Sequence, residues 1–314
     1  MRYNYVTIKG TGSYLPPTVV SNAEITKNVD TTEEWIFSKL GIKERRVAKE
    51  ETTAQMGYKA AVNALRNANL TIDDIDLIIV ATSSPEHIAP STACTIHNQF
   101  GTSRDIPAID MNAVCAGFVY AMTFAMPMIS MGACNNVLII GTEAYSKMTD
   151  WTKQHCVFFG DGAGAMVLGN STSGWAVSTL SANGSGTGMT GFRCYYPTPF
   201  EMQGKQVWDQ AIKVLPPSIT RALTEAQLQA DDVKMLIPHQ PSINILKIVA
   251  KEVGLPMEKV KTVMDRYGNI ACASIPVALD EAVQNGEVGD GDQLVLSSIG
   301  SGWAWGSLTI QYKR

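Results

Sequence analysis

The sequence predicts an α/β protein of two similar halves, with mostly parallel sheets and helices on both faces of the sheets. Two observations support this class. Helical and strand patterns alternate along the chain, and segments of its first half recur in its second half. Alternation of this kind is typical of parallel sheets, because each crossover helix packs against the sheet between two strands. A chain of 314 residues is long enough for two packed halves.

Local patterns give the elements of the first half. Apolar residues at helical spacing, β-branched runs and helix-starting residues distinguish its helices from its strands. The first 16 residues predict a strand followed by a turn. The elements after them are a helix at 53–69, a strand at 76–84, a short helix at 90–100, a strand at 105–112, a helix at 115–134 and a strand at 136–144.

Three segments recur at nearly one offset. Residues 63–84 align with 221–242 at a shift of 158. At a shift of 157, residues 115–122 align with 272–279 and residues 136–141 with 293–298. Three matches near one offset indicate a duplicated fold.

The boundary between the halves is predicted at residue 170, which gives halves 1–170 and 171–314. The reason is the sequence NSTSG at 170–174, whose composition is typical of a turn. In a duplicated architecture, loops at equivalent strand ends would meet near a pseudo-twofold axis. Residues of the second half could then approach residues of the first.

Composition excludes several classes of function. The net charge is −4, which argues against broad binding of nucleic acid or anionic membrane. Six widely spaced cysteines without any CxxC pair argue against zinc and favour free thiols in the cytoplasm. Charged residues make up only 17% of the chain, so a large core, an oligomer interface or both are expected.

One uncharged stretch, 111–142, is long enough to suggest a membrane span. It contains Gly117, Pro127 and Gly132, and no Lys or Arg lies close to either end. A helix buried in a large core is the better interpretation, and no membrane insertion is expected.

Cys115 is the candidate nucleophile. It lies where a predicted strand ends and the uncharged helix begins. Unpaired backbone N–H groups at a helix start stabilise a thiolate relative to a thiol. A buried structural cysteine is the alternative.

His239 and Asn269 are the candidate partners from the second half. His239 directly follows a predicted strand, and the aligned segment of the first half has no histidine. Asn269 follows Gly268, so it is either an ordinary turn residue or an amide aimed at a substrate carbonyl. The glycine-rich segment 160–169 lacks the Lys-Ser/Thr of a phosphate loop and predicts a turn that enters a strand.

Taken together, these motifs resemble the thiolase-fold condensing enzymes, specifically the β-ketoacyl-[acyl-carrier-protein] synthase III family of fatty acid synthesis. The resemblance implies a thiolase-like, five-layered αβαβα fold with mixed sheets. The motifs that support it are GTGSYLP (10–16), DTTEEWI (30–36), GIKERR (41–46), CAGF (115–118), FGDGAGA (159–165), PHQ (238–240), GN (268–269), ALDEA (278–282) and WGS (305–307).

The resemblance also implies roles. Cys115 would take an acyl group from an acyl-CoA, and His239 and Asn269 would stabilise the enolate formed when malonyl-carrier protein loses CO2. Backbone N–H groups of Cys115 and Ser301 would form the oxyanion hole. The family's condensing acyltransferases are homodimers and need no metal or redox cofactor.

Further residues match substrate and partner contacts of the family. Trp35, Lys39 and Ser242 correspond to CoA-binding positions, and Ala89 corresponds to the end of the acyl tunnel. Lys247 and Lys251, which share one face of a predicted helix, correspond to carrier-protein docking.

Departures from the family pattern affect the substrate. Ala89 stands where many members have a bulky aromatic residue, which predicts a preference for acyl groups longer than acetyl, or branched ones. Lys39 replaces a frequent Arg, and Ser242 a frequent Asn. A condensing enzyme of polyketide-type metabolism and a non-catalytic acyl-binding subunit are the alternative hypotheses, and a cysteine hydrolase is a weaker one.

Overall fold

The computed structural model describes residues 1–182, 191–194 and 199–313. The strands are β1 (Arg2–Tyr14), β2 (Thr18–Ser21), β3 (Glu44–Val47), β4 (Leu77–Ala81), β5 (Ala108–Met111), β6 (Asn136–Ala144), β7 (Asp161–Ala182), β8 (Phe192–Arg193), β9 (Glu201–Met202), β10 (Val233–Pro238), β11 (Gln293–Gly300) and β12 (Ala304–Gln311). The helices are α1 (Asn22–Ile25), α2 (Glu33–Leu40), α3 (Thr53–Ala68), α4 (Thr92–Phe100), α5 (Gly117–Ser130), α7 (Gly204–Ala226), α8 (Ile243–Glu252), α9 (Met264–Tyr267) and α10 (Ser274–Gln284).

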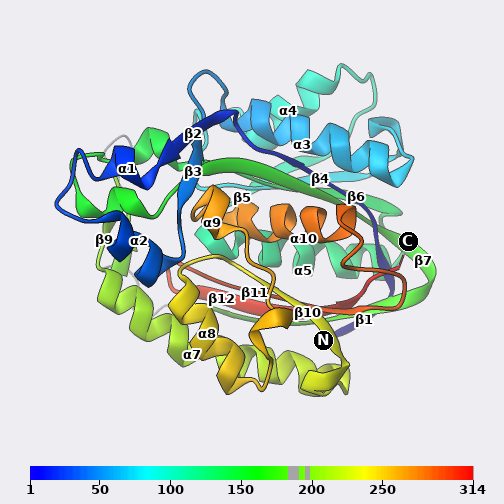
Figure 1. Cartoon of the computed structure of the whole chain (residues 1–314). Coiled ribbons are helices and arrows are strands. Elements are labelled where there is room, and N and C mark those ends of the chain that lie inside the picture. The colour runs from blue at the N-terminus through cyan, green and yellow to red at the C-terminus, as the bar shows by residue number, and fades with distance from the viewer. Residues whose placement is uncertain (183–190, 195–198, 314) are drawn as a thin grey trace.

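These elements form five layers, as the resemblance implied (Figure 1). Helices α3 and α4 cover one outer face, and β4, β5 and β6 lie beneath them. Helices α5 and α10 occupy the middle layer. Strands β10, β11 and β12 follow, and α7 and α8 cover the other outer face.

Each interface between layers has its own apolar core. One cluster packs α3 and α4 on the first set of strands, and a second packs α7 and α8 on the other. The third lies in the middle and contains Phe118 and Met122 of α5 with Leu279 of α10. Most of α5 is buried in this cluster, and the side chains that it exposes, such as Phe124 and Met128, are also apolar, so the helix has no charged residue. Within the described part of the chain, no helix has the length and apolar character needed to cross a membrane.

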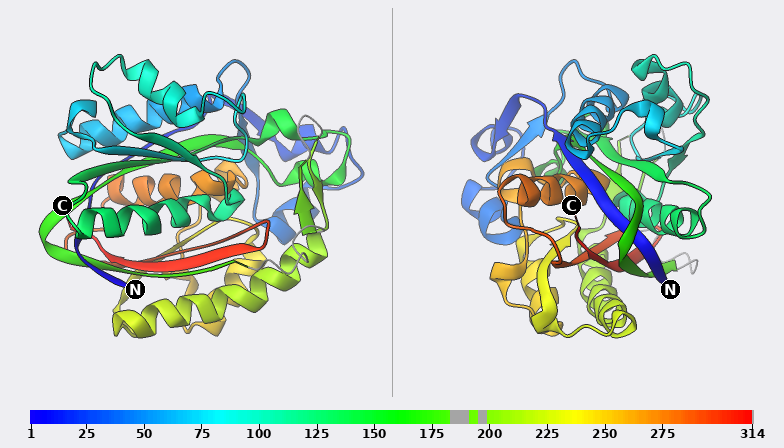
Figure 2. Two further views of the ribbon diagram at one scale, coloured as in Figure 1. Left: turned by 180° about the vertical axis from the view of Figure 1, so that it is seen from behind. Right: turned by 90° about the vertical axis from the view of Figure 1, so that its right-hand side faces the viewer.

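Eight of the described strands join into one mixed sheet that extends through both halves, and β2–β3 and β8–β9 form two separate antiparallel pairs. Pairs β4–β5, β4–β6 and β10–β11 are parallel. Antiparallel pairs made by β7 and β12 connect these outer parts. Residues 161–169 of β7 pair with β6, and residues 176–182 pair with β12. Strand β1 runs antiparallel to β7 along both parts, and Figure 2 shows the two crossing the molecule together.

The turn predicted at 170–174 is therefore wrong. Strand β7 continues through these residues, and the register against β1 shifts between Asn4 and Val6, opposite Trp175 and Asn170. Gly174, with φ +121°, accommodates the irregularity. The polar NSTSG composition marks a bulged stretch of strand, so the halves share a strand and no linker separates them.

The predicted elements of the first half are present, with ends trimmed by a few residues. Ser91 caps α4, and Cys115 lies in a 3₁₀ turn, Val114–Ala116, that precedes α5. The duplication is visible in the second half. A 3₁₀ turn at Ala271–Ala273 precedes α10, as the turn at Val114–Ala116 precedes α5.

Candidate active site

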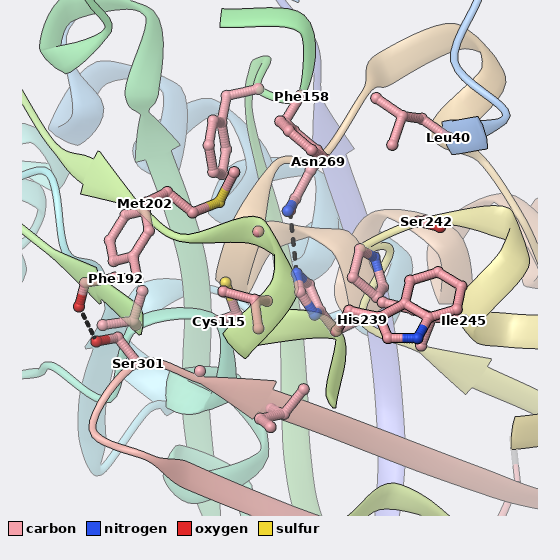
Figure 3. A pocket seen from close by; sticks show the side chains of 18 of the residues that line it. Leu40, Cys115, Phe158, Phe192, Met202, His239, Ser242, Ile245, Asn269 and Ser301 are labelled. Carbon is pink, nitrogen blue, oxygen red and sulfur yellow. Dashed lines mark hydrogen bonds between the residues drawn. The ribbon is translucent and has the colours of Figure 1, made fainter. Parts of the chain in front are cut away.

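A cavity of about 410 Å³ lies between the two halves, and Cys115, His239 and Asn269 all line it. Figure 3 shows the three side chains facing one another, with Phe158 and Met202 on one side and Ser242 and Ile245 on the other. The residues predicted from opposite halves of the sequence therefore meet, as the duplication implied.

Strand β11 of the second half holds the turn of Cys115. Ser298 Oγ donates a hydrogen bond to the Cys115 carbonyl at 2.7 Å. At Gly300, a Cβ atom would lie 2.5 Å from the Ala113 carbonyl and 3.0 Å from the Cys115 nitrogen, so only glycine fits. Val114 adopts φ +49°, and Asn112 Oδ1 accepts from its N–H at 3.2 Å. Contacts from both halves thus fix the nucleophile's backbone.

His239 is held at the end of β10. Its backbone N–H donates to the Ser297 carbonyl at 2.8 Å, and its side chain is buried. Nε2 lies 3.0 Å from Asn269 Oδ1. Because that oxygen also accepts from the Ala271 N–H at 2.9 Å, the amide orientation is set and Nε2 must be the donor. Nδ1 is buried without a partner among the described residues, so the ring is the neutral Nε2–H tautomer.

Two backbone hydrogen bonds hold Asn269. Its N–H donates to the Phe158 carbonyl at 2.8 Å, and its own carbonyl accepts from the Gly160 N–H at 3.1 Å. Gly268 has φ +67°, which lets the chain turn into this position. The Asn269 amide nitrogen remains to face the cavity. The two interpretations of Asn269 are thus compatible: it can be a turn residue after Gly268 and also present its amide to a substrate.

The duplication extends to the site. Asn112 lies three residues before Cys115, and Asn269 lies three residues before Cys272. In both places the Asn side chain accepts from the N–H two residues on, and that residue, Val114 or Ala271, has positive φ. One duplicated turn therefore places Cys115, the candidate nucleophile, in its first copy and the amide of Asn269 in its second.

The surroundings of Cys115 contradict the expectation that its position at a helix start favours a thiolate. Burial raises the pKa of the Cys115 thiol, and the carboxyl of Glu143 raises it further. The effect of desolvation on the Cys115 pKa therefore outweighs the effect of the backbone N–H groups at the helix start. The resting residue is a thiol. Glu143 is itself fully buried, with Ser83 Oγ, Ser84 Oγ and Cys272 Sγ donating to it at 2.8, 2.5 and 3.1 Å. Burial also raises the pKa of this carboxyl.

The predicted CoA-binding residues lie at the cavity mouth. Trp35 and Lys39, both exposed, project from α2 and line the cavity with Ser242. The hydroxyl of Ser242 caps α8 by accepting from the Asn244 N–H and donates to the Lys39 carbonyl at 3.2 Å. Ser242 therefore joins α8 to α2, and its hydroxyl is already engaged.

A second cavity of about 270 Å³ adjoins the first. Val114, Phe192 and Ser301 line both cavities, and Ser83, Tyr145 and Ile88 line the second. Ser301 Oγ donates to the Phe192 carbonyl at 2.5 Å, which leaves its backbone as the group available for the predicted oxyanion hole.

Ala89 does not line either cavity within this chain. It is exposed, in the same loop as Ile88, of which 89% is exposed. Ala89 itself therefore closes no tunnel within a single chain, although its neighbour Ile88 borders the second cavity. Lys247 and Lys251 are exposed on α8, outside the main cavity.

Sequence reasoning missed the aromatic wall around Cys115. Tyr145 stacks on Phe159 with ring centroids 4.8 Å apart, and Phe192 stacks on Phe200 at 5.2 Å. These rings cluster with Cys115 and come from four separate segments. Only Phe159 belongs to a motif noted above, and no local pattern marks the other three.

The fold and the site together define a thiolase-fold protein whose buried cavity joins a cysteine to a histidine and an asparagine. Residues 109–184 match the model of 3-oxoacyl-[acyl-carrier-protein (ACP)] synthase III, and residues 223–312 match the model of that enzyme's C-terminal part.

Known proteins similar to this chain agree with these matches. A curated β-ketoacyl-[acyl-carrier-protein] synthase III of Oceanobacillus iheyensis is 40% identical over 98% of this chain and 99% of its own. The crystal structure of the synthase III of Aquifex aeolicus has a TM-score of 0.94 at 38% identity and covers 98% of this chain and 100% of its own. The priming β-ketosynthase of the R1128 polyketide pathway has a TM-score of 0.93 at 29% identity, covering 99% of this chain and 97% of its own. The chain belongs to the β-ketoacyl-[acyl-carrier-protein] synthase III family, a family of condensing acyltransferases of fatty acid synthesis.

The buried histidine predicts a pH dependence of stability. Burial lowers the pKa of His239 to about 4, whereas an unfolded histidine titrates near 6.5. As pH falls below about 6.5, only the unfolded state gains this proton, so the folded state loses stability until about pH 4. From pH 7 to pH 4.5, we expect His239→Gln to lose about 2 kcal/mol less unfolding free energy than the wild type. Urea unfolding at both pH values tests this, and equal losses in the two proteins would contradict it.

Proposed function

We propose that this enzyme condenses an acyl-CoA primer with malonyl-[acyl-carrier protein], with Cys115 holding the primer. The observation that supports the proposal most is the meeting of the buried side chains of Cys115, His239 and Asn269 in one largely apolar cavity. Thioester exchange and decarboxylation need no electron transfer, so we propose that no metal or redox cofactor takes part.

In the first half-reaction, Cys115 attacks the acyl-CoA carbonyl. The S–C bond to CoA breaks, the new S–C bond forms on Cys115, and the thiol proton ends on CoA. The Cys115 and Ser301 backbone N–H groups are proposed to stabilise the tetrahedral oxyanion.

In the second half-reaction, the malonyl thioester loses CO2 and forms an enolate. The amide N–H of Asn269 is proposed to donate to the enolate oxygen, together with the Nε2–H of His239, which would exchange its Asn269 Oδ1 acceptor for the substrate. Its carbon attacks the acyl carbonyl on Cys115, and the expelled thiolate takes up a proton. The buried walls shield the acyl-enzyme from hydrolysis.

Trp35, Lys39 and Ser242 are proposed to line the path of CoA. Trp35 offers a half-exposed indole face for the adenine, and the ammonium of Lys39 suits the phosphates.

Lys247 and Lys251 are proposed to dock the acidic carrier protein, so reversing both charges should raise the KM for malonyl-carrier and leave that for acyl-CoA unchanged. With six free cysteines, we place the enzyme in the cytoplasm.

A homodimer is proposed, formed at the edge of the sheet. Strand β5 ends the described strand order, and Ile109 on it is 47% exposed. Phe124 of neighbouring α5 is 57% exposed, and Met131, which directly follows this helix, is 76% exposed. An apolar patch beside an unpaired edge strand suits a second copy of this chain, and the partner's Ala89 loop would then face the second cavity. Sedimentation at micromolar concentration as a 33.9 kDa monomer would contradict this.

Separate assays of the two half-reactions test the residue roles. Wild-type protein mixed with butyryl-CoA should gain one butyryl mass on Cys115, whereas Cys115→Ala should gain none. Asn269→Ala should still be acylated but release CO2 from malonyl-carrier at least about 100-fold more slowly, the lower end of the loss typical of removing one oxyanion donor. Absence of any adduct on the wild type would favour the acyl-binding alternative.

The second cavity predicts the primer. Its volume of about 270 Å³ exceeds the need of an acetyl group, which favours a longer or branched acyl chain. We expect kcat/KM to be highest for a primer of four or more carbons, and Ala89→Phe to shift the optimum towards acetyl-CoA. Steady-state rates across a series of acyl-CoAs measure both, and an optimum at acetyl-CoA in the wild type would contradict the prediction.

Priming of a polyketide-type pathway is the second candidate. The likeness to the R1128 priming ketosynthase at 29% identity favours it. The same series, run with carrier proteins of both pathways, separates the candidates by carrier selectivity.

A further inference from the structure

Arg45 is a buried cation with no carboxylate of the described chain in direct contact, although the more distant charges of Glu24 and Glu44 favour its charged form. It lies on β3 within the motif GIKERR, and its side chain is 0% exposed. Burial lowers its pKa to about 10, so it stays charged at pH 7. Among the described residues it forms no ion pair, and its Nε has no hydrogen-bond partner. Burying an unpaired charge disfavours folding, so stability alone does not account for an arginine here.

The guanidinium joins two parts of the chain that lie far apart in sequence. Nη1 donates to the Val20 carbonyl at 3.2 Å and to Asn22 Oδ1 at 2.9 Å. Nη2 donates to the Val157 carbonyl at 2.9 Å. Val157 directly precedes the segment 158–160, whose backbone holds Asn269 through two hydrogen bonds.

The stem of Arg45 packs against the same junction. A Cβ placed on Gly160 would lie 3.0 Å from the Arg45 Cβ, and a Cβ on Gly268 would lie 3.2 Å from it. Gly160 is the last residue of the segment 158–160, and Gly268 directly precedes Asn269. Both glycines therefore lie at the junction that the two backbone hydrogen bonds form. Arg45 therefore touches this junction both through its Cβ and through its guanidinium.

We propose that Arg45 is a positioning residue for Asn269, acting through the Val157 carbonyl and the segment 158–160. This inference rests on the proposed role of Asn269 in stabilising the enolate. It predicts a loss in the decarboxylation step with little change in acylation of Cys115, because Ser298 and Gly300 hold the nucleophile from another strand.

The test compares Arg45→Lys and Arg45→Met with the wild type in both half-reactions. Lysine retains the charge but cannot reach both sets of acceptors in the fork geometry of arginine. We expect acylation by butyryl-CoA within about threefold of wild type and CO2 release from malonyl-carrier at least about tenfold slower, a typical cost of misplacing one donor. Arg46→Lys, at the neighbouring half-buried position, is the matched control and should alter neither step.

A double variant distinguishes positioning from general damage. If Arg45 acts through Asn269, Arg45→Lys should slow CO2 release by less than about twofold in an Asn269→Ala background, since interacting residues are not additive. Full additivity would overturn the inference. Hydrogen exchange of the peptide covering 157–160 should also be faster in Arg45→Lys than in Arg46→Lys.

Other outcomes are equally decisive. Asn22→Ala removes one acceptor of the Arg45 guanidinium. This variant provides the test if the Arg45 variants do not fold. We expect it to slow CO2 release about threefold and to leave acylation of Cys115 unchanged. Equal losses in both half-reactions, or no loss, would overturn the positioning role. A wild type that neither forms the adduct nor releases CO2 would instead refute the proposed function itself.

Discussion

The pairing of β1 with β7 is the constraint on which the rest of the structure depends. Strand β7 belongs to the upper and lower parts of the sheet, and β1 runs beside it along both. This shared pair fixes how the two halves face each other. With the halves fixed, the turn of Cys115 in one half lies against the end of β11 in the other.

Close contact at that meeting point leaves no room for side chains. Gly300 lies against the backbone of the Cys115 turn, and in the other half Gly141 lies against Cys272, with a Cβ 2.7 Å from the Cys272 carbonyl. Gly141 aligns with Ser298, whose hydroxyl donates to the Cys115 carbonyl, so these two contacts are related by the duplication, but the chemistry differs. The first turn faces the cavity, whereas Cys272 is fully buried beside Glu143.

Burial makes the resting thiol of Cys115 less reactive, but it also favours carbon–carbon bond formation over hydrolysis. It raises the pKa of Cys115 and lowers that of His239, so the resting site is an uncharged thiol beside an uncharged imidazole. A neutral pair is cheaper to hold in a water-poor cavity than an ion pair. The same exclusion of water protects an acyl thioester, which makes the site better suited to carbon–carbon bond formation than to hydrolysis.

The sequence by itself determined most of the element types and the duplication, and its resemblance to the family predicted the three residues of the site. Local periodicity and repeated motifs record the elements and the duplication. The tertiary structure decided the path of β7 through residues 170–174, the outward position of Ala89, the pKa direction of Cys115 and the contacts of Arg45. Strand pairing, desolvation and a hydrogen bond from residue 45 to residue 157 all depend on groups remote in sequence, which no local pattern encodes.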